Sequence, residues 1–109
     1  MHIRIYWGKV LGEQWPTIER RYRELMNFPA PGLLARFVSQ DVNDHESMFT
    51  ITFWQDAESI RAWEASDDYT NLYLAAVSPF ITGAMSVSLC EVKLFEAAAL
   101  ASALSLQPG

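Results

Sequence analysis

The sequence predicts an α+β fold built from elements in the order β-α-β-β-α-β. Four segments rich in strand-forming residues and two regions with apolar residues at helical spacing follow one another in that order. The chain has 109 residues, half of them apolar and 19% charged, which suits one globular domain with a modest core. This order is that of the ferredoxin-like split βαβ motif, in which all helices cover one face of a four-stranded antiparallel sheet.

The first two elements are predicted from short apolar patterns. Ile3, Ile5 and Trp7 alternate with other residues, which is the period of a strand. From Trp15 onward apolar residues recur at the spacing of a helical stripe, and the helix is predicted to end near Asn27, before two prolines. The sequence therefore predicts a strand followed by an amphipathic helix.

The remaining elements are delimited by polar loops and capping residues. Residues 33–40 and 46–55 predict two strands of a hairpin, joined by a polar loop. Asp56 is the predicted N-cap of a short helix, and Ser66 is the predicted N-cap of another. A final strand is predicted over residues 84–95.

The domain is predicted to occupy residues 1–95, followed by a tail over residues 96–109. The tail is rich in Ala and Leu and has good helix propensity, with Leu100 and Leu104 on one helical face. No repeat, linker or second domain is predicted.

Composition excludes several classes of function. A net charge of -5 with only 8 Lys and Arg residues offers no cationic field for nucleic acid. No apolar run approaches the roughly 20 residues of a membrane span or forms a signal peptide. The single cysteine, Cys90, suits a reducing compartment, so a cytoplasmic location is expected. Phosphate-binding, dinucleotide-binding and nucleophile-elbow motifs do not occur, and His2 and His45 are too isolated to predict a metal site.

The third predicted strand has no obvious water-facing side. Phe49, Ile51 and Phe53 share one side, which is expected to face a second copy of the chain. Pairing two such sheets buries roughly 800 Å², about 20 kcal/mol gross at about 25 cal/mol/Å², against an association cost of about 4 to 15 kcal/mol. We therefore expect a homodimer that packs sheet against sheet. The other side, expected to face the helices, carries Thr50, Thr52 and Trp54.

That helix-facing side predicts a small-molecule pocket. Buried hydroxyls such as those of Thr50 and Thr52 need a partner, or a cavity that holds water or a ligand. Trp63 and Tyr73 lie ten residues apart on the two helices that follow the hairpin. If both point at this strand, they enclose a flat, mostly apolar ligand, so a small planar aromatic molecule is the predicted partner. The alternative reading of these aromatic residues is ordinary core packing.

The segment from Met48 to Tyr69, MFTITFWQDAESIRAWEASDDY, resembles the antibiotic biosynthesis monooxygenase family of dimeric α/β barrels. The resemblance rests on a strand that ends in Trp54, followed by Trp63-x-x-Ser66-x-x-Tyr69, and the order of elements agrees over residues 1–95. It implies oxidation of a phenolic or anthrone substrate by O₂, with no metal or flavin. The family's asparagine four residues before the strand tryptophan is Thr50 here, and its tyrosine six residues after is Ile60.

The resulting site hypothesis assigns six residues. Tyr73 and Thr50 are the expected catalytic residues, which orient the polar end of the substrate. The expected substrate-binding residues are Trp54, Trp63, Trp7 and Tyr69.

Two alternatives remain open at this level. Heme-degrading relatives use an asparagine on the first strand, a helix tryptophan and a histidine ten residues later; these positions are Trp7, Trp63 and Tyr73 here, so only the tryptophan is kept. A tyrosinate is a known heme ligand but needs help to ionise. The other alternative is a non-catalytic binding or stress-response barrel that keeps the dimer.

Overall fold

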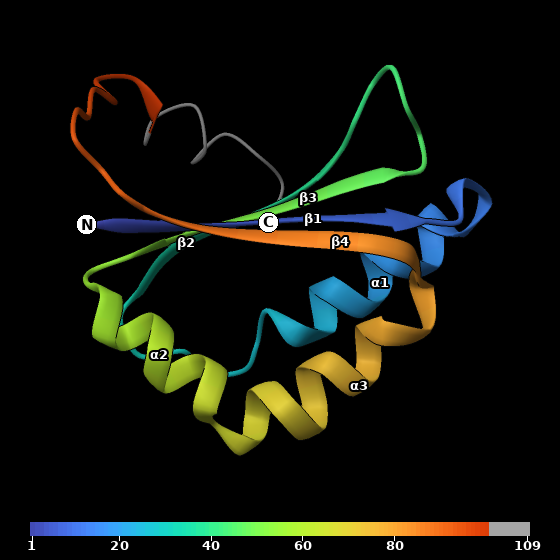
Figure 1. Cartoon of the computed structure of the whole chain (residues 1–109), viewed down its shortest axis with the longest axis horizontal. Coiled ribbons are helices and arrows are strands. Elements are labelled where there is room, and N and C mark those ends of the chain that lie inside the picture. Colours follow the sequence, from blue (N-terminus) through green and yellow to red (C-terminus); the bar gives the residue numbers. More distant parts are fainter. Residues whose placement is uncertain (101–109) are drawn as a thin grey trace.

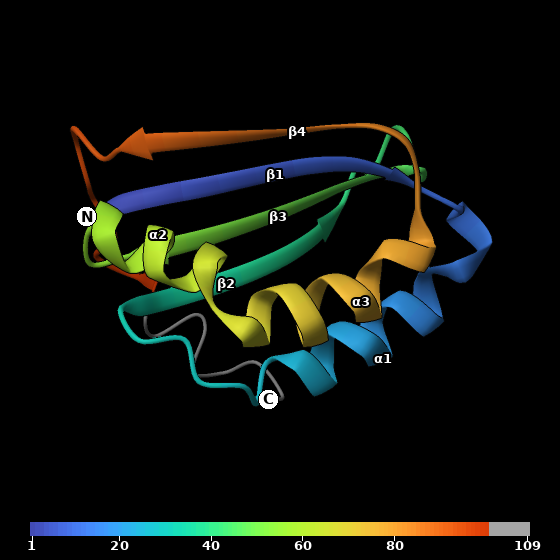
Figure 2. The ribbon, with the colours of Figure 1, turned by 60° about the horizontal axis from the view of Figure 1, so that its bottom comes forward.

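The computed structural model describes residues 1–100 and has a two-layer α+β architecture (Figure 1). One layer is a four-stranded antiparallel sheet in the order β2-β3-β1-β4, and the helices form the second layer on one face of it (Figure 2). This is the predicted ferredoxin-like fold. The elements are β1 (His2–Val10), a 3-10 turn (Gly12–Gln14), α1 (Trp15–Leu25), β2 (Leu33–Gln40), β3 (Ser47–Trp54), α2 (Ala57–Ala65), a π-helical segment (Asp68–Tyr73), α3 (Leu74–Val77), a second 3-10 turn (Ser78–Phe80) and β4 (Ile81–Glu91).

Helix starts follow the predicted capping chemistry. Asp56 Oδ1 accepts a hydrogen bond from the backbone N–H of Ser59 at 2.8 Å and begins α2. Ser66, the C-cap of α2, accepts with its Oγ from the backbone N–H of Tyr69 at 3.1 Å, which ties the end of α2 to the π-helical segment. Hydroxyl and carboxylate oxygens thereby satisfy backbone donors that have no partner within the helix.

The last strand differs from its prediction, since it runs from Ile81 to Glu91 rather than over residues 84–95. Its register against β1 shifts between Gly8 and Val10. Gly83 lies in the shifted part of β4 with a φ of +76°, a conformation that glycine adopts without steric cost. The glycine thus lies within an irregular strand instead of preceding it.

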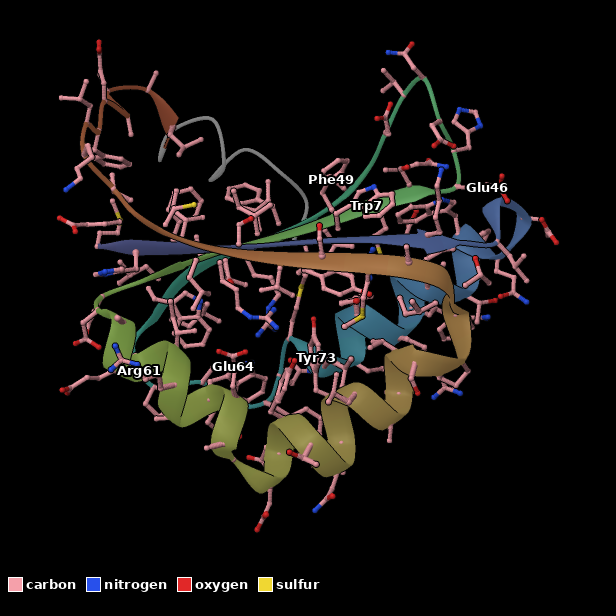
Figure 3. All side chains as sticks on the ribbon, in the orientation of Figure 1. Trp7, Glu46, Phe49, Arg61, Glu64 and Tyr73 are labelled. Atoms are coloured by element: carbon pink, nitrogen blue, oxygen red, sulfur yellow. The ribbon has the colours of Figure 1, made fainter. Side chains whose placement is uncertain are left out.

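Strand alternation separates the two faces of the sheet as predicted. On β3, Thr50 is 3% exposed and Trp54 is fully buried beneath the helices, whereas Phe49 and Ile51 are only half-buried on the opposite face. Cross-strand pairing places Trp7 of β1 beside Phe49 on that open face (Figure 3). Helices α1, α2 and α3 all lie on the other face, so the open face is an apolar surface that these three helices leave uncovered.

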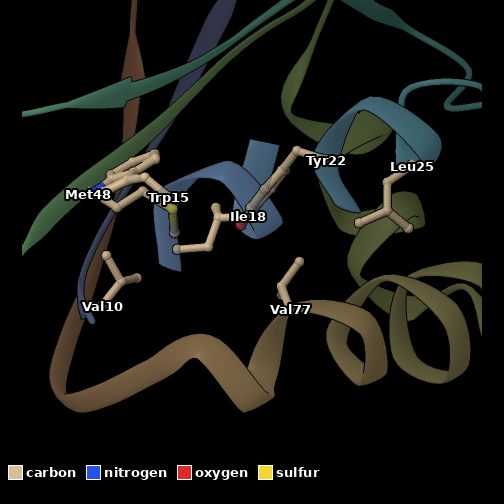
Figure 4. Close-up of a cluster of buried hydrophobic side chains, with 7 residues drawn as sticks. All are labelled: Val10, Trp15, Ile18, Tyr22, Leu25, Met48 and Val77. Atoms are coloured by element: carbon tan, nitrogen blue, oxygen red, sulfur yellow. The ribbon is translucent and has the colours of Figure 1, made fainter. Parts of the chain in front are cut away.

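Two clusters of buried side chains hold the helices on the sheet. The first, drawn in Figure 4, consists of Val10, Trp15, Ile18, Tyr22, Leu25, Met48 and Val77. The second consists of Trp54, Ile60 and Trp63. Tyr73 packs against both clusters, so it lies where they meet. Each fully buried aliphatic side chain stabilises the fold by about 1.5 to 3 kcal/mol.

No helix within residues 1–100 is long and apolar enough to cross a membrane. The predicted helical tail falls mostly on residues 101–109, including Leu104, which lie outside the described part of the chain.

Candidate functional site

A cavity of about 190 Å³ lies between the sheet and the helices at the junction of the two core clusters. Its polar lining residues are Arg4, Tyr6, Tyr22, Thr50, Tyr69, Tyr73 and Ser78. Its apolar lining includes Leu74, Val77, Ile81, Met85 and Val87. Because Met85 and Val87 of the edge strand β4 are exposed, the mouth of the cavity lies along that edge.

A second hollow, of about 380 Å³, lies between α1 and the edge strand β2. It is a surface groove with charged and polar groups on its rim, among them Glu19, Arg23 and Gln40. None of the six predicted site residues lines it. The cavity at the junction of the two clusters is therefore the candidate site.

Thr50 and Thr52 share the helix-facing side of β3 but have different hydrogen bonding. Thr52 Oγ1 accepts the indole N–H of Trp54 at 2.8 Å and lies 3.4 Å from the carbonyl oxygen of Arg4. Thr50 Oγ1 is buried and makes no hydrogen bond of ordinary geometry within residues 1–100, although it is near enough to the Tyr22 hydroxyl to offset part of the effect of burial on the pKa of Tyr22. Buried hydroxyls are nearly always paired, so the Thr50 hydroxyl is available to a ligand in the cavity.

Arg4 supplies a buried cation from β1. The residue is 9% exposed, and its Nη2 donates to the Tyr69 hydroxyl at 3.1 Å and lies 3.6 Å from a carboxylate oxygen of Glu64. The guanidinium also lies 5.7 Å from the centre of the Tyr69 ring, within cation-π range. Arg4 therefore forms one wall of the cavity and is held there by Tyr69.

Tyr73 stands at the centre of an aromatic cluster. Its ring meets those of Tyr22 and Trp63 edge to face at 5.8 Å and stacks on Tyr69 at 5.8 Å. Such aromatic contacts restrict ring motion and contribute about 0.5 to 1.5 kcal/mol each. In Figure 3 the Tyr73 side chain points from the helices toward the sheet.

Burial controls the protonation of three tyrosines in this cavity, Tyr6, Tyr22 and Tyr73. Loss of solvation raises the pKa of Tyr73 well above its usual value, and the neighbouring Tyr22 hydroxyl raises it further. Burial likewise raises the pKa of Tyr22 and of Tyr6. These phenols keep their protons at neutral pH, so they serve as hydrogen-bond donors and not as general bases.

The structure brings together some of the predicted site residues and separates others. Thr50, Tyr69 and Tyr73 line the cavity. Trp63 lies behind the two tyrosines, with its ring 5.5 Å from that of Tyr69, and does not line the cavity itself. Trp54 belongs to the second core cluster, where its indole N–H is satisfied by a threonine hydroxyl. Trp54 is therefore a core residue and does not line the cavity.

Trp7 lies on the opposite face of the sheet, so its expected contact with a ligand beside Tyr73 is not found. The alternation of β1 turns Tyr6, not Trp7, toward the helices. The Trp7 indole N–H donates to Ser47 Oγ at 3.3 Å, and its ring lies 5.9 Å from the ammonium group of Lys9.

Sequence reasoning missed Arg4, Tyr6 and Tyr22. Arg4 and Tyr6 alternate with the apolar residues of the first predicted strand, which places both on the helix-facing side. An arginine at such an inward position was a usable signal, because a charge is seldom buried without a role. Tyr22 occupies the apolar stripe of α1 and is indistinguishable there from a core residue.

The lining residues do not fit heme. The cavity is smaller than the roughly 300 Å³ of the smallest drug-sized ligand sites, and a tetrapyrrole is a large ligand. No histidine lines the cavity, and the raised pKa of Tyr73 disfavours the tyrosinate that would bind iron. Within residues 1–100 no three His, Cys, Asp or Glu side chains are grouped to hold a metal ion.

Comparison with known proteins identifies similar chains at the level of family and fold. The family model described as antibiotic biosynthesis monooxygenase matches residues 8–73. No curated protein gives a significant match to the chain.

Several solved structures share the fold at low sequence identity. The heme-degrader MhuD from Mycobacterium tuberculosis, solved with two hemes in its active site, is 24% identical, with a TM-score of 0.68 over 88% of this chain and 99% of that one. SnoaB, a cofactor-independent oxygenase from Streptomyces nogalater, is 13% identical, with a TM-score of 0.67 over 86% and 94% of the two chains. A conserved protein from Methanosarcina mazei is 17% identical, with a TM-score of 0.70 over 85% and 94%.

Proposed function

This chain belongs to the antibiotic biosynthesis monooxygenase family, and from that premise we propose that it binds a small planar aromatic molecule beside Thr50 and Tyr73 and oxidises it with O₂. The observation that carries the proposal is a cavity with aromatic and aliphatic walls, lined also by the buried Thr50 hydroxyl, which makes no hydrogen bond of ordinary geometry among residues 1–100. Small-molecule sites commonly combine such walls with a few placed polar groups. The volume of about 190 Å³ suits a ligand of one or two rings.

In the proposed reaction the substrate itself supplies the electrons. One atom of O₂ enters the substrate as a new carbonyl oxygen, and the other leaves as water with two hydrogens that the substrate loses. Tyr73 donates a hydrogen bond to a substrate oxygen, and the Thr50 hydroxyl orients the same end of the molecule. Trp63 acts as a positioning residue, because its ring packs against the tyrosines that contact the ligand.

The open face of the sheet supports a homodimer as part of the proposal. Half-buried apolar side chains cover that face on three strands, among them Ile5, Phe37 and Ile51, which lie in one cross-strand row. Phe37 also packs edge to face against Phe53 at 6.0 Å. A second copy that packs on this face removes the apolar surface from water while leaving the cavity, on the other side of the sheet, free to bind its ligand.

A non-catalytic binding module is the second candidate, and one observation favours it. The cavity residues whose pKa is shifted are Tyr6, Tyr22 and Tyr73, and burial raises the pKa of each. None of the described residues that line the cavity is a histidine or a carboxylate, the side chains suited to take a proton from a substrate at neutral pH.

Oxygen uptake and binding, measured on the same samples, separate the two candidates. Phenols of one, two and three rings are added to the full chain, and protein-dependent O₂ consumption is followed together with tryptophan fluorescence. We expect uptake with a one- or two-ring phenol, reduced at least about tenfold in Tyr73→Phe and Thr50→Val and unchanged in Thr70→Val, whose side chain is exposed on the same helical segment. Binding without uptake supports the binding module, and the absence of binding overturns both candidates.

A further inference from the structure

Two arginines occupy the helix-facing side of the sheet in a protein whose net charge is -5. Arg36 of β2 and Arg4 of β1 flank Thr52 of β3 in one cross-strand row. Arg4 is 9% exposed and Arg36 is half-buried. Removing a guanidinium from water carries a large cost unless a carboxylate or several hydrogen bonds compensate for it.

These two cations have only partial compensation within residues 1–100. Arg4 forms an ion pair with Glu64 at 3.6 Å. The Glu64 side chain is 35% exposed, so solvent weakens this ion pair. Arg36 has no carboxylate within 4 Å among the described residues, and its guanidinium lies 5.7 Å from the centre of the Tyr73 ring. The Nε of each arginine is buried without a hydrogen-bond partner in this part of the chain. Of the two cations, Arg4 is therefore paired with one partly exposed carboxylate and Arg36 is paired with none among residues 1–100.

The uncompensated charge acts at the cavity. Arg4 lines it directly, and both arginines favour the ionised form of the Tyr73 hydroxyl, which also lines it. Burial nevertheless keeps Tyr73 protonated, so the positive field is not neutralised by a protein phenolate. Thr50, two residues further along β3 and opposite Tyr6, offers a buried hydroxyl with no hydrogen bond of ordinary geometry among residues 1–100. A negatively charged ligand atom both compensates the charge of Arg4 and accepts a hydrogen bond from the Thr50 hydroxyl.

We propose that this cavity binds its aromatic ligand as an anion, a phenolate whose oxygen accepts hydrogen bonds from the Arg4 guanidinium and the Thr50 hydroxyl. The proposal rests on the proposed function for the site and the aromatic shape of the ligand, and not on the oxidation step. Binding moves the proton of the phenol to solvent, with no change in oxidation state. The site then needs no basic side chain, because the field of Arg4 and Arg36 favours loss of that proton.

We expect the bound ligand to change its protonation state with pH, while the side chains around it keep theirs. Arginine side chains in proteins carry a permanent positive charge. Burial raises the pKa of Tyr6, Tyr22 and Tyr73. The charged and titratable groups that line the cavity are Arg4 and Tyr6 on β1, Tyr22 on α1, and Tyr69 and Tyr73 on the π-helical segment. Behind them, Arg36 on β2 lies beside Tyr73, and Glu64 on α2 lies beside Arg4.

The test uses 4-nitrophenol, whose phenolate absorbs visible light, and nitrobenzene, a neutral molecule of similar shape. The pH titration of 4-nitrophenol is followed by absorbance with and without saturating protein, and nitrobenzene binding is followed by quenching of tryptophan fluorescence. An opposite charge within about 4–6 Å shifts a pKa by about 1–3 units. We therefore expect the pKa of bound 4-nitrophenol to fall by at least about one unit, so that the phenolate binds at least about tenfold more tightly than the phenol.

Two variants of Arg4 and a control variant of Arg61 test whether Arg4 causes the pKa shift of the bound ligand. Arg4→Gln is expected to abolish most of it, while Arg4→Lys retains part of it because the charge remains. Arg61→Gln removes an equal charge from the exposed surface of α2 and is expected to leave the shift intact (Figure 3). Circular dichroism confirms that each variant is folded. If Arg4→Gln does not fold, the wild-type titration and Arg4→Lys still decide the question.

The outcomes separate this proposal from the proposed function. A bound pKa that is unchanged or raised overturns the anion proposal, as does a shift that survives Arg4→Gln. If nitrobenzene binds in those cases, the cavity remains a site for neutral aromatic molecules. If neither probe binds, the proposed function fails as well. Absence of O₂ uptake alongside a lowered bound pKa refutes oxidation and leaves anion binding in place.

Discussion

Thr50 and Thr52 provide a matched pair of substitutions with opposite expected effects on stability. They lie two residues apart on β3, face the same side of the sheet, and are 3% and 5% exposed. Replacement of either by valine makes the same chemical change, from a hydroxyl to a methyl group. The variants differ in what each hydroxyl does in the folded chain, so their comparison isolates the hydrogen bond.

The magnitudes follow from the partners of each hydroxyl. Thr52→Val leaves the buried indole N–H of Trp54 without its acceptor at 2.8 Å, which costs about 1–3 kcal/mol of unfolding free energy. Thr50→Val removes a buried hydroxyl that has no partner within residues 1–100, so it is expected to be neutral or to stabilise the fold by up to about 1 kcal/mol. The two variants should therefore differ by roughly 2 kcal/mol.

Urea denaturation of the wild type and both variants, at one protein concentration, measures this difference. A common concentration is needed because association couples stability to concentration. We expect equal slopes, a lower midpoint for Thr52→Val, and a midpoint at or above the wild type for Thr50→Val. Equal destabilisation of both variants would refute the reasoning, since it would mean that the Thr50 hydroxyl is already satisfied in the folded chain. Thr50→Val should also bind the phenolate probe several-fold more weakly than the wild type.

Three further predictions concern other parts of the molecule. Ile51→Asp places a charge on the open face of the sheet and should give a monomeric mass by light scattering at micromolar concentration, whereas a persistent dimer contradicts the proposed interface. Asp44 has a pKa lowered to about 2, mainly by its hydrogen bond from Lys9. Its contribution to stability is complete above about pH 4 and is lost as the pH falls toward 2, so Asp44→Asn should show a smaller drop in urea midpoint between pH 5 and pH 3 than the wild type. Gly32 has a φ of +88° and adjoins Ser59, so Gly32→Ala should lower the unfolding free energy by about 1–3 kcal/mol, and an unchanged midpoint would contradict the assigned backbone conformation.

The sequence by itself determined the order of elements and the faces of the sheet. Both depend on local periodicity, because side chains alternate across a strand whatever surrounds it. The same alternation grouped Trp7 with Ile3 and Ile5, on the side now seen to be open. The role assigned to Trp7 in ligand binding came from family resemblance instead, and local periodicity already argued against it.

Only the tertiary structure decided which of these side chains meet at a site. Thr50 and Thr52 are equivalent in the sequence pattern, yet one hydroxyl is bound to Trp54 and the other faces a cavity. The cavity is assembled from strands and helices far apart in sequence, and it brings Arg4 beside Tyr69, 65 residues away. Such contacts depend on how the helices pack across the sheet, and that packing is decided by the shapes of the whole core and not by any local pattern.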